Sequence, residues 1–358
     1  MEKYSAYRDP GTGVQLASPF TWLVGTFRTA LLFVILALHL LLVDGVSLIF
    51  IPIPVLHRFI TRIFTFLTAR LALFSLGILW VSVDNVTRKR GRGAKDIETW
   101  HPRAGDIIVS NWVSYVEILW LAFRYACEST MHCKSVPTPD ASTQEAITHT
   151  PGRRTGTGSA NVTATTARVA TTRVPIVGFR QVSLLSAICS VGTTPDASGR
   201  WQSLEEIRSN ARRPVVVFPE CTTSNGRALL HFANVFKQKV PVRGYNVFVM
   251  CVRYDPPTGF AATLAHTIPT PLNPLAHIFT VAASLAPQAV SIRLLAPSES
   301  PSSQLFLASE VLTGSNDQDP LADACASLIS QIGKMKRTGM GWEDKVSFLD
   351  LFHSKKKR

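Results

Sequence analysis

Residues 106–110 (DIIVS) and 214–218 (PVVVF) decide the fold class of this chain. Both are short, continuous apolar runs, and two more follow at 246–254 (NVFVMCVRY) and 289–295 (AVSIRLL). Runs without polar alternation are typical of strands that are buried on both faces of a sheet. Helices are expected between and after these strands, at 114–126, 202–210 and 320–336. The pattern predicts an α/β domain.

The N-terminal quarter is apolar enough to enter a membrane. Residues 29–43 (TALLFVILALHLLLV) carry no formal charge, and a second apolar arm (VSLIFIPIPVL) covers 46–56 after Asp44 and Gly45. Each arm is shorter than the roughly 20 residues of a spanning helix, and a single helix would hold Asp44 near its middle. We therefore expect a helical hairpin that enters the bilayer and returns, with both ends on the cytosolic side.

Residues 59–83 stay apolar but, with Arg58, carry arginines that fall on one side of a helical wheel. An interfacial helix would place these arginines among lipid headgroups, whereas a buried core helix would let them snorkel. The basic cluster RKRGRGAK follows at 88–95. Residues 1–95 are therefore interpreted as a membrane hairpin, an interfacial helix and a basic juxtamembrane cluster.

The rest of the chain divides into a main domain over 96–300 and a helical tail with a basic end over 301–358. Residues 137–172 are rich in Thr, Ser, Ala, Gly and Pro and contain almost no large apolar residues. Such a segment cannot bury enough apolar surface to fold, so a disordered insertion is expected there.

Composition limits the partners and the chemistry. The 37 Lys and Arg exceed the 24 Asp and Glu by 13, yet charged residues are only 17% and hydrophobic ones 46%. This balance argues against a nucleic-acid partner and favours membrane lipid. The six cysteines form no CxxC and no metal-type pairing with histidine, so we expect reduced core thiols, no metal site and no cofactor.

The stretch VVVFPECTTSNGRALLHF, residues 215–232, resembles the third motif of glycerolipid acyltransferases of the PlsC type. In that family a strand ends in Phe-Pro-Glu-Gly and a Thr/Ser/Asn-rich turn follows, which binds the glycerol-phosphate acceptor. Cys221 occupies the position of the glycine. The resemblance implies a mixed sheet flanked by helices, and it implies five substrate-binding residues: Phe218, Pro219, Glu220, Thr222 and Arg227.

The stretch DIIVSNWVSYVEILWLAF, residues 106–123, resembles the first block of the same family, in which a strand leads to Asn-His-x-Ser-x-x-Asp. The matched catalytic positions are Asn111, Ser114 and Glu117. Here Trp112 stands in the position of the histidine that acts as general base, and an indole is a donor only. A positioned base typically contributes about 10²–10⁴ in rate, so the usual mechanism requires a substitute.

Two further stretches extend the resemblance to about residues 100–255. Pro175 and Gly178 match the block after the first motif, and Val240 with Pro241 matches the fourth. The tail GMGWEDKVSFLDLF, from Gly339, is similar to that of the fungal lysophosphatidic acid:oleoyl-CoA acyltransferase group. The resemblance implies an acyl-CoA-dependent lysophospholipid acyltransferase of glycerolipid synthesis, with acyl-CoA as co-substrate and lysophosphatidic acid as acceptor.

The missing histidine leaves two functions open. If the protein is an enzyme, Glu117 is the first candidate for the proton acceptor, followed by His132 and His231. A covalent acyl group on Cys221 is conceivable, but a small buried thiol is the preferred interpretation of that residue. The alternative is a catalytically inactive relative that binds lipid and acts in membrane trafficking or lipid-droplet organisation. In either case Asn111 and Pro219 should share one rim, with Trp112 beside Glu220.

The chain ends in Lys355, Lys356, Lys357 and Arg358, which has the spacing of a dilysine retrieval signal. Such signals are read from the cytosol, so the endoplasmic reticulum membrane, at its cytosolic face, is the expected location, with lipid droplets as a second site. A solvated basic tail is the simpler interpretation.

Overall fold

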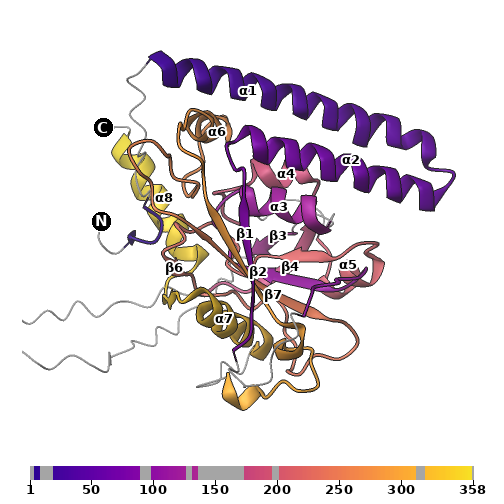
Figure 1. Ribbon diagram of the computed structural model, residues 1–358. Coiled ribbons are helices and arrows are strands. Elements are labelled where there is room, and N and C mark those ends of the chain that lie inside the picture. Colours follow the sequence, from indigo (N-terminus) through magenta and orange to yellow (C-terminus); the bar gives the residue numbers. More distant parts are fainter. Residues whose placement is uncertain are drawn as a thin grey trace, which may run out of the picture.

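The computed structural model describes most of the chain (Figure 1). The described residues are 4–8, 19–88, 98–125, 131–135, 173–195, 201–311 and 319–356, without the side chains of 131–135 and 355–356. The expected insertion, 137–172, lies outside them, as does most of the basic cluster at 88–95.

A five-stranded mixed sheet forms the centre of the domain. Its order is β1-β8-β7-β2-β5, with β7 and β8 antiparallel and every other neighbouring pair parallel. The four apolar runs of the sequence are four of its strands, which confirms a mixed sheet in an α/β fold. The strands are β1 (Val81–Val86), β2 (Ile107–Ser110), β5 (Val215–Val217), β7 (Val247–Tyr254) and β8 (Val290–Leu295).

Helices cover both faces of this sheet, as predicted (Figure 1). Alternate residues of β2 divide between the two cores, because successive side chains of a strand point to opposite faces. Ile108 packs with α3 (Val116–Tyr125), whereas Ile107 packs with the core that includes α7 (Pro320–Gly333).

The domain extends beyond both limits expected from the sequence. Strand β1 begins within 59–83, where a helix was expected, runs on to Val86, and pairs in register with β8. Helix α7 belongs to the supposed tail but contributes Leu321, Leu328 and other fully buried side chains to the main core. The sheet and its core therefore include β1 and α7, which lie outside residues 96–300.

A helical hairpin is present, but its second arm is not residues 46–56 as expected: it is residues 54–75, most of which were expected to form an interfacial helix. Helix α1 (Pro19–His39) continues through a π-helical segment (Leu40–Gly45) and a 3-10 segment (Val46–Phe50) before the chain reverses at 51–53. Helix α2 (Pro54–Ser75) then runs back beside α1 (Figure 1). The reversal occurs at the IPIP sequence because each proline lacks an N–H and disfavours helical geometry in the residue before it.

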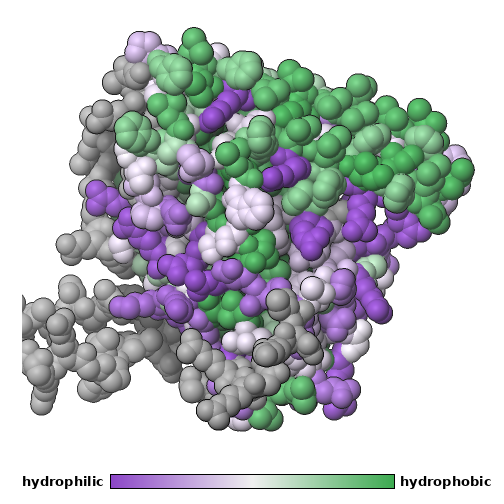
Figure 2. All heavy atoms as spheres, in the orientation of Figure 1, coloured by the Kyte–Doolittle hydropathy of each residue, from purple (hydrophilic) through white to green (hydrophobic). Residues whose placement is uncertain are grey.

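Large apolar side chains cover the outer surface of the hairpin (Figure 2). Phe27 of α1 is 69% exposed and Phe59 of α2 is 61% exposed, whereas the buried positions of α2 are mostly small or hydroxylated. By length and composition, the continuous helix of residues 19–50 is long and apolar enough to cross a membrane. It is the one such helix among the residues that the structure describes.

The hairpin is attached to the domain through α6 (Leu275–Ala282). The guanidinium of Arg28 donates to the carbonyl oxygens of Ala282 (3.2 Å) and Ser284 (2.8 Å), where α6 ends. Gly25 lies so close to α6 that a Cβ there would stand 2.9 Å from the Cβ of Ala283. A cation at a helix C-terminus is favourable. Arg28 therefore fixes the position of α1 along its axis relative to the end of α6.

Smaller elements complete the fold. Strands β3 (Met131–Ser135) and β4 (Ile176–Gln181) pair antiparallel on either side of the expected insertion, and β6 (Ala228–Leu229) pairs with β9 (Lys336–Arg337). Short helices α4 (Leu184–Cys189) and α5 (Leu204–Asn210) precede β5, and α8 (Trp342–Lys356) is the last helix described. Of the cysteines with described side chains, Cys221, Cys251 and Cys325 are buried thiols and Cys189 is exposed.

Candidate functional site

The first and third motif-like stretches meet at the carboxyl edge of the sheet. Strands β2 and β5 are parallel neighbours, with Val109 opposite Val217, so the loops that follow them emerge side by side. The backbone N–H of Trp112 donates to Glu220 Oε1 (3.2 Å), and the N–H of Ser224 donates to the Trp112 carbonyl (3.0 Å). The expected common rim and the neighbouring positions of Trp112 and Glu220 are confirmed.

Asn111 is occupied by the sheet. Its Nδ2 donates to the Val252 carbonyl (3.0 Å), and its Oδ1 accepts from the Val252 N–H (2.8 Å). The side chain therefore extends the hydrogen bonding between β2 and β7 past the last residue of β2. This geometry fixes the start of the loop and gives the buried amide a structural role.

Trp112 fills the position of the family's histidine with an indole that stacks on Phe218, with ring centroids 5.0 Å apart and an interplanar angle of 14°. The indole is buried, and its Nε1 has no hydrogen-bond partner among the described residues. Phe218 thus holds the Trp112 indole by stacking. The position therefore has no side chain that can accept a proton.

Glu117 holds the loop from inside. Its Oε1 accepts from the N–H groups of Val113 and Ser114 (2.7 Å for Ser114), and its Oε2 accepts from the Tyr254 hydroxyl. Burial raises the pKa of Glu117 to about 7, although these hydrogen bonds oppose the rise. A pKa near neutrality suits a base, but both oxygens are engaged by the chain's own donors. This arrangement favours a positioning role.

Three other predicted residues are also buried in this region. The Ser114 Oγ lies 3.5 Å from the Val116 N–H at the start of α3, and the Thr222 hydroxyl donates to the Thr193 carbonyl (2.8 Å). Pro219 is buried and its carbonyl accepts from the Ala233 N–H (2.9 Å). These contacts hold the turn against the domain.

Cys221 has a φ of 54°, in the left-handed region that favours glycine. This is the position at which the resembling family has its glycine. The turn therefore has, at Cys221, a backbone conformation that glycine adopts without strain.

Glu220 is fully buried, and burial raises its pKa well above the usual value of 4.5. Its Oε1 accepts from Trp112, whereas its Oε2 has no partner among the described residues. The Leu230 N–H also acts on this carboxylate and lowers its pKa, but an oxygen left without a hydrogen bond of normal geometry costs about 1–3 kcal/mol.

Arg227 does not join this buried group. Its side chain is exposed, and its backbone N–H donates to Asn225 Oδ1 (3.2 Å). Of the two histidines proposed as substitute bases, the side chain of His132 lies outside the described residues. Burial, together with Arg173 and Arg337, lowers the pKa of His231 to about 4, which keeps that ring neutral.

Sequence reasoning missed a histidine pair beside the same loops. The His266 N–H donates to the Val113 carbonyl (3.0 Å), and the Thr223 hydroxyl donates to the His266 carbonyl (2.7 Å). The ring of His277 lies 4.6 Å from that of His266 and makes a 3.3 Å contact with the Tyr115 hydroxyl. Burial lowers the pKa of His277 to about 3. No sequence pattern marked these histidines, because they lie about 150 residues after the loop.

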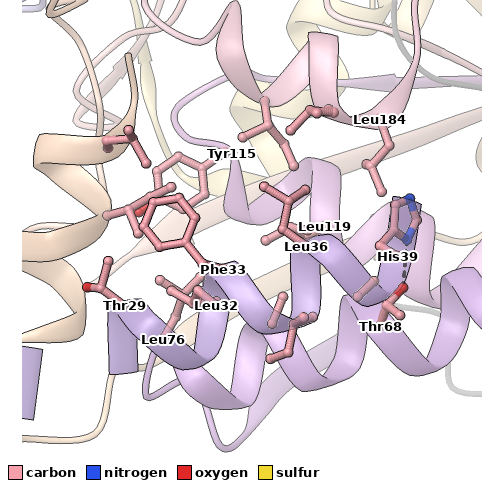
Figure 3. Close-up of a pocket in the computed structure, with 17 residues that line it drawn as sticks. Thr29, Leu32, Phe33, Leu36, His39, Thr68, Leu76, Tyr115, Leu119 and Leu184 are labelled. Atoms are coloured by element: carbon pink, nitrogen blue, oxygen red, sulfur yellow. Dashed lines mark hydrogen bonds between the residues drawn. The ribbon is translucent and has the colours of Figure 1, made fainter. Parts of the chain in front are cut away.

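An apolar cavity of about 130 Å³ lies between the hairpin and the domain (Figure 3). Its walls come from α1, α2, α3, α4 and α6, with side chains such as Leu36, Leu119 and Leu184. Polar side chains are few, and two of them, His39 and Thr68, satisfy each other (2.8 Å). Tyr115, the residue after Ser114, forms part of the wall, so the cavity and the motif loops share one segment of chain.

Comparison of the chain with protein-family models, with curated proteins and with solved structures gave no match.

Proposed function

We propose that this protein is a membrane-bound acyltransferase that esterifies a lysophospholipid, with lysophosphatidic acid as acceptor and acyl-CoA as donor. The observation that carries this proposal is the apolar cavity, which reaches the loop of the first motif-like stretch at Tyr115. An acyl chain is the ligand that suits an almost wholly apolar cavity beneath an apolar hairpin.

The surroundings support a lipid substrate. Both proposed substrates are anionic amphiphiles that concentrate at a membrane surface, and the chain carries a net charge of +13. The outer face of the hairpin exposes large apolar side chains, so the cavity is adjacent to the surface from which a lipid would enter. In this proposal the hairpin faces the cytosolic leaflet of the endoplasmic reticulum or a lipid droplet, and the terminal lysines serve retrieval.

The proposal is tested by blocking the cavity. Leu36→Trp places a large ring in the cavity wall, whereas Leu23→Trp, on the same helix, adds the same ring at a position that is 67% exposed. With purified full-length protein in liposomes, lysophosphatidic acid and oleoyl-CoA, the first variant should lose at least tenfold in kcat/KM. The second should keep wild-type activity. Equal activity of both variants would contradict the role of the cavity.

A second function, lipid binding without catalysis, is favoured by one observation. Trp112 and Glu117 occupy the positions of the family's base and its orienting carboxylate, and neither side chain is placed to accept a proton from a substrate. In the same liposomes, saturable binding of a fluorescent acyl lipid that Leu36→Trp weakens, without transfer by the wild type, would establish this second function.

A further inference from the structure

The tail at 339–352 enters the site through one side chain. Lys345, in the first turns of α8, is fully buried, and its Nζ donates to the Thr223 carbonyl (2.9 Å) and the Thr223 hydroxyl (3.2 Å). Thr223 lies three residues after Glu220 in the third motif-like stretch. We name Trp112, Glu220, Thr223 and Lys345 the Glu220 cluster.

The environment of Lys345 favours a neutral amine. Among the described residues no carboxylate oxygen lies within the 4.0 Å of an ion pair with its Nζ, although Glu220 is near enough to attract its charge. Burial lowers the pKa of Lys345 from 10.5 to about 7, against the opposing effect of Glu220. Near neutral pH a large share of the protein therefore carries a lone pair on Nζ.

Two buried polar atoms in the same cluster are available to a polar ligand. Glu220 Oε2 and Trp112 Nε1 are both buried without a hydrogen bond in the described part of the chain. One is an acceptor or an acid, and the other is a donor. A hydroxyl group is both donor and acceptor, so the alcohol of an acyl acceptor is a ligand that could satisfy either atom.

We propose that Lys345 is the proton acceptor of acyl transfer, in place of the imidazole that Trp112 has displaced. This inference rests on the proposed acyltransferase function. The neutral Nζ takes the proton of the acceptor hydroxyl as its oxygen attacks the thioester carbonyl. The new C–O bond forms, the C–S bond breaks, and the coenzyme A thiolate leaves. The lysine ammonium then returns its proton to that thiolate, which restores the neutral amine and releases the free thiol.

Residues 4–8 pack against the turn and the start of α8, the two segments that carry Glu220, Thr223 and Lys345. Tyr7 is fully buried and its hydroxyl donates to the Gly341 carbonyl, while the Asn225 amide N–H groups of backbone and side chain donate to Ala6 (3.0 Å) and Ser5 (2.8 Å). An acceptor reaches Lys345 when this segment leaves the turn. The movement of residues 4–8 is part of the same proposal, because Lys345 is closed to solvent while this segment is in place.

The decisive experiment compares Lys345→Arg and Lys345→Met with the wild type in the liposome assay. Arginine keeps the charge and the donors but cannot lose its proton, and methionine keeps the length of the side chain. Both variants should lose about 10²–10⁴ in kcat, the usual contribution of a positioned base. Lys334→Met, at an exposed lysine after α7, is the matched control and should keep wild-type activity.

The pH profile separates a chemical role from a structural one. The kcat of the wild type should fall on the acid side with an apparent pKa near 7, and this limb should be absent from the residual activity of Lys345→Met. If the methionine variant does not fold, the arginine variant and the wild-type profile decide. An active wild type together with an active Lys345→Arg, or an active wild type without the acid limb, would overturn the role of Lys345 alone. A wild type without transfer would overturn both this inference and the enzymatic function.

Discussion

The apolar cavity and the Glu220 cluster draw on the same loop, yet they are built in opposite ways. The cavity is walled by five helices that contribute ordinary apolar side chains, with Tyr115 as its link to the loop. The cluster gathers an indole, a carboxyl and an amine from segments more than a hundred residues apart, and two of its buried polar atoms have no partner in the described structure. The difference teaches that, in the proposed function, lipid binding rests on packing, whereas the transfer step rests on buried polar groups that packing leaves unsatisfied.

The largest effect is expected from the carboxylate that holds the shared loop. Glu117→Ala leaves the buried N–H groups of Val113 and Ser114 without an acceptor, at about 1–3 kcal/mol each, so unfolding free energy should fall by about 2–6 kcal/mol. Glu117→Gln keeps an oxygen for these donors and should cost much less. Urea unfolding in micelles measures both variants. Equal losses for the two would show that the oxygen is not what holds the loop.

Truncation of a side chain in the wall of the apolar cavity should lower the stability of the protein without changing how that stability depends on pH. Leu119 is buried in the cavity wall, and Leu119→Ala should destabilise the protein by about 2–5 kcal/mol, as large-to-small core changes do. Because no titratable group is altered, the loss should be the same at pH 7 and pH 9. A loss that depends on pH over this range would show that the cavity and the Glu220 cluster are electrostatically linked.

The polar side should respond to pH through Lys345. Its pKa is about 7 in the folded protein and 10.5 ordinarily, so between these values the unfolded chain binds one proton more than the native state. Stability from this group therefore rises with pH by about 1.4 kcal/mol per unit above pH 7, and it is constant below pH 7.

The wild type should accordingly gain up to about 2.7 kcal/mol relative to Lys345→Met between pH 7 and pH 9. Removal of the lysine also takes away the attraction that lowers the pKa of Glu220, and this change acts in the same direction. A difference in unfolding free energy that stays flat over this pH range would contradict a neutral Lys345 in the native state.

A smaller effect is expected at the cover of the cluster. Asn225→Ala removes the side-chain donations to the carbonyls of Ser5 and Arg8, and each such bond is worth about 0.5–1.5 kcal/mol. The Tyr7 N–H should exchange with solvent roughly 5–100 times faster as a result. Asn210→Ala, at an exposed asparagine of α5, is the control and should leave this rate unchanged. Unchanged exchange in Asn225→Ala would show that Tyr7 alone retains the cover.

The smallest effect concerns the backbone of the turn at Cys221. Alanine and glycine both remove the thiol, but glycine alone tolerates a φ of 54° without strain. Cys221→Gly should therefore be more stable than Cys221→Ala by about 1–2 kcal/mol, the reverse of the usual order of these residues. Thermal unfolding of the two variants provides the comparison, and greater stability of the alanine variant would contradict a strained turn.

The sequence predicted the parts of the molecule that depend on local pattern. Apolar runs located β2, β5, β7 and β8, and the motif resemblance brought Trp112 next to Glu220. Strand β1 was missed because it follows α2 without a change in apolar character. The hairpin turn was misplaced because Asp44 was weighed more heavily than Pro52 and Pro54.

The two features of the site that were missed share one physical reason. A lysine in an amphipathic helix ordinarily faces solvent, and nothing within α8 reveals that Lys345 is covered by residues 4–8 and the turn at Thr223. The contacts of His266 and His277 with the first loop likewise depend on a segment about 150 residues further along the chain. When a side chain is buried by a segment far away in the sequence, the residues around it carry no pattern that predicts the burial.

The bond between Arg28 and the end of α6 has a mechanical consequence. Because the guanidinium fastens α1 to the carbonyls of Ala282 and Ser284, and Gly25 admits no gap between the helices, the joint has no room to flex. In a bilayer the hairpin and the domain would then move as one rigid body. A change in lipid thickness or tension that tilts the hairpin would tilt the entire domain with it. The apolar cavity would then be held at a constant depth relative to the lipid surface.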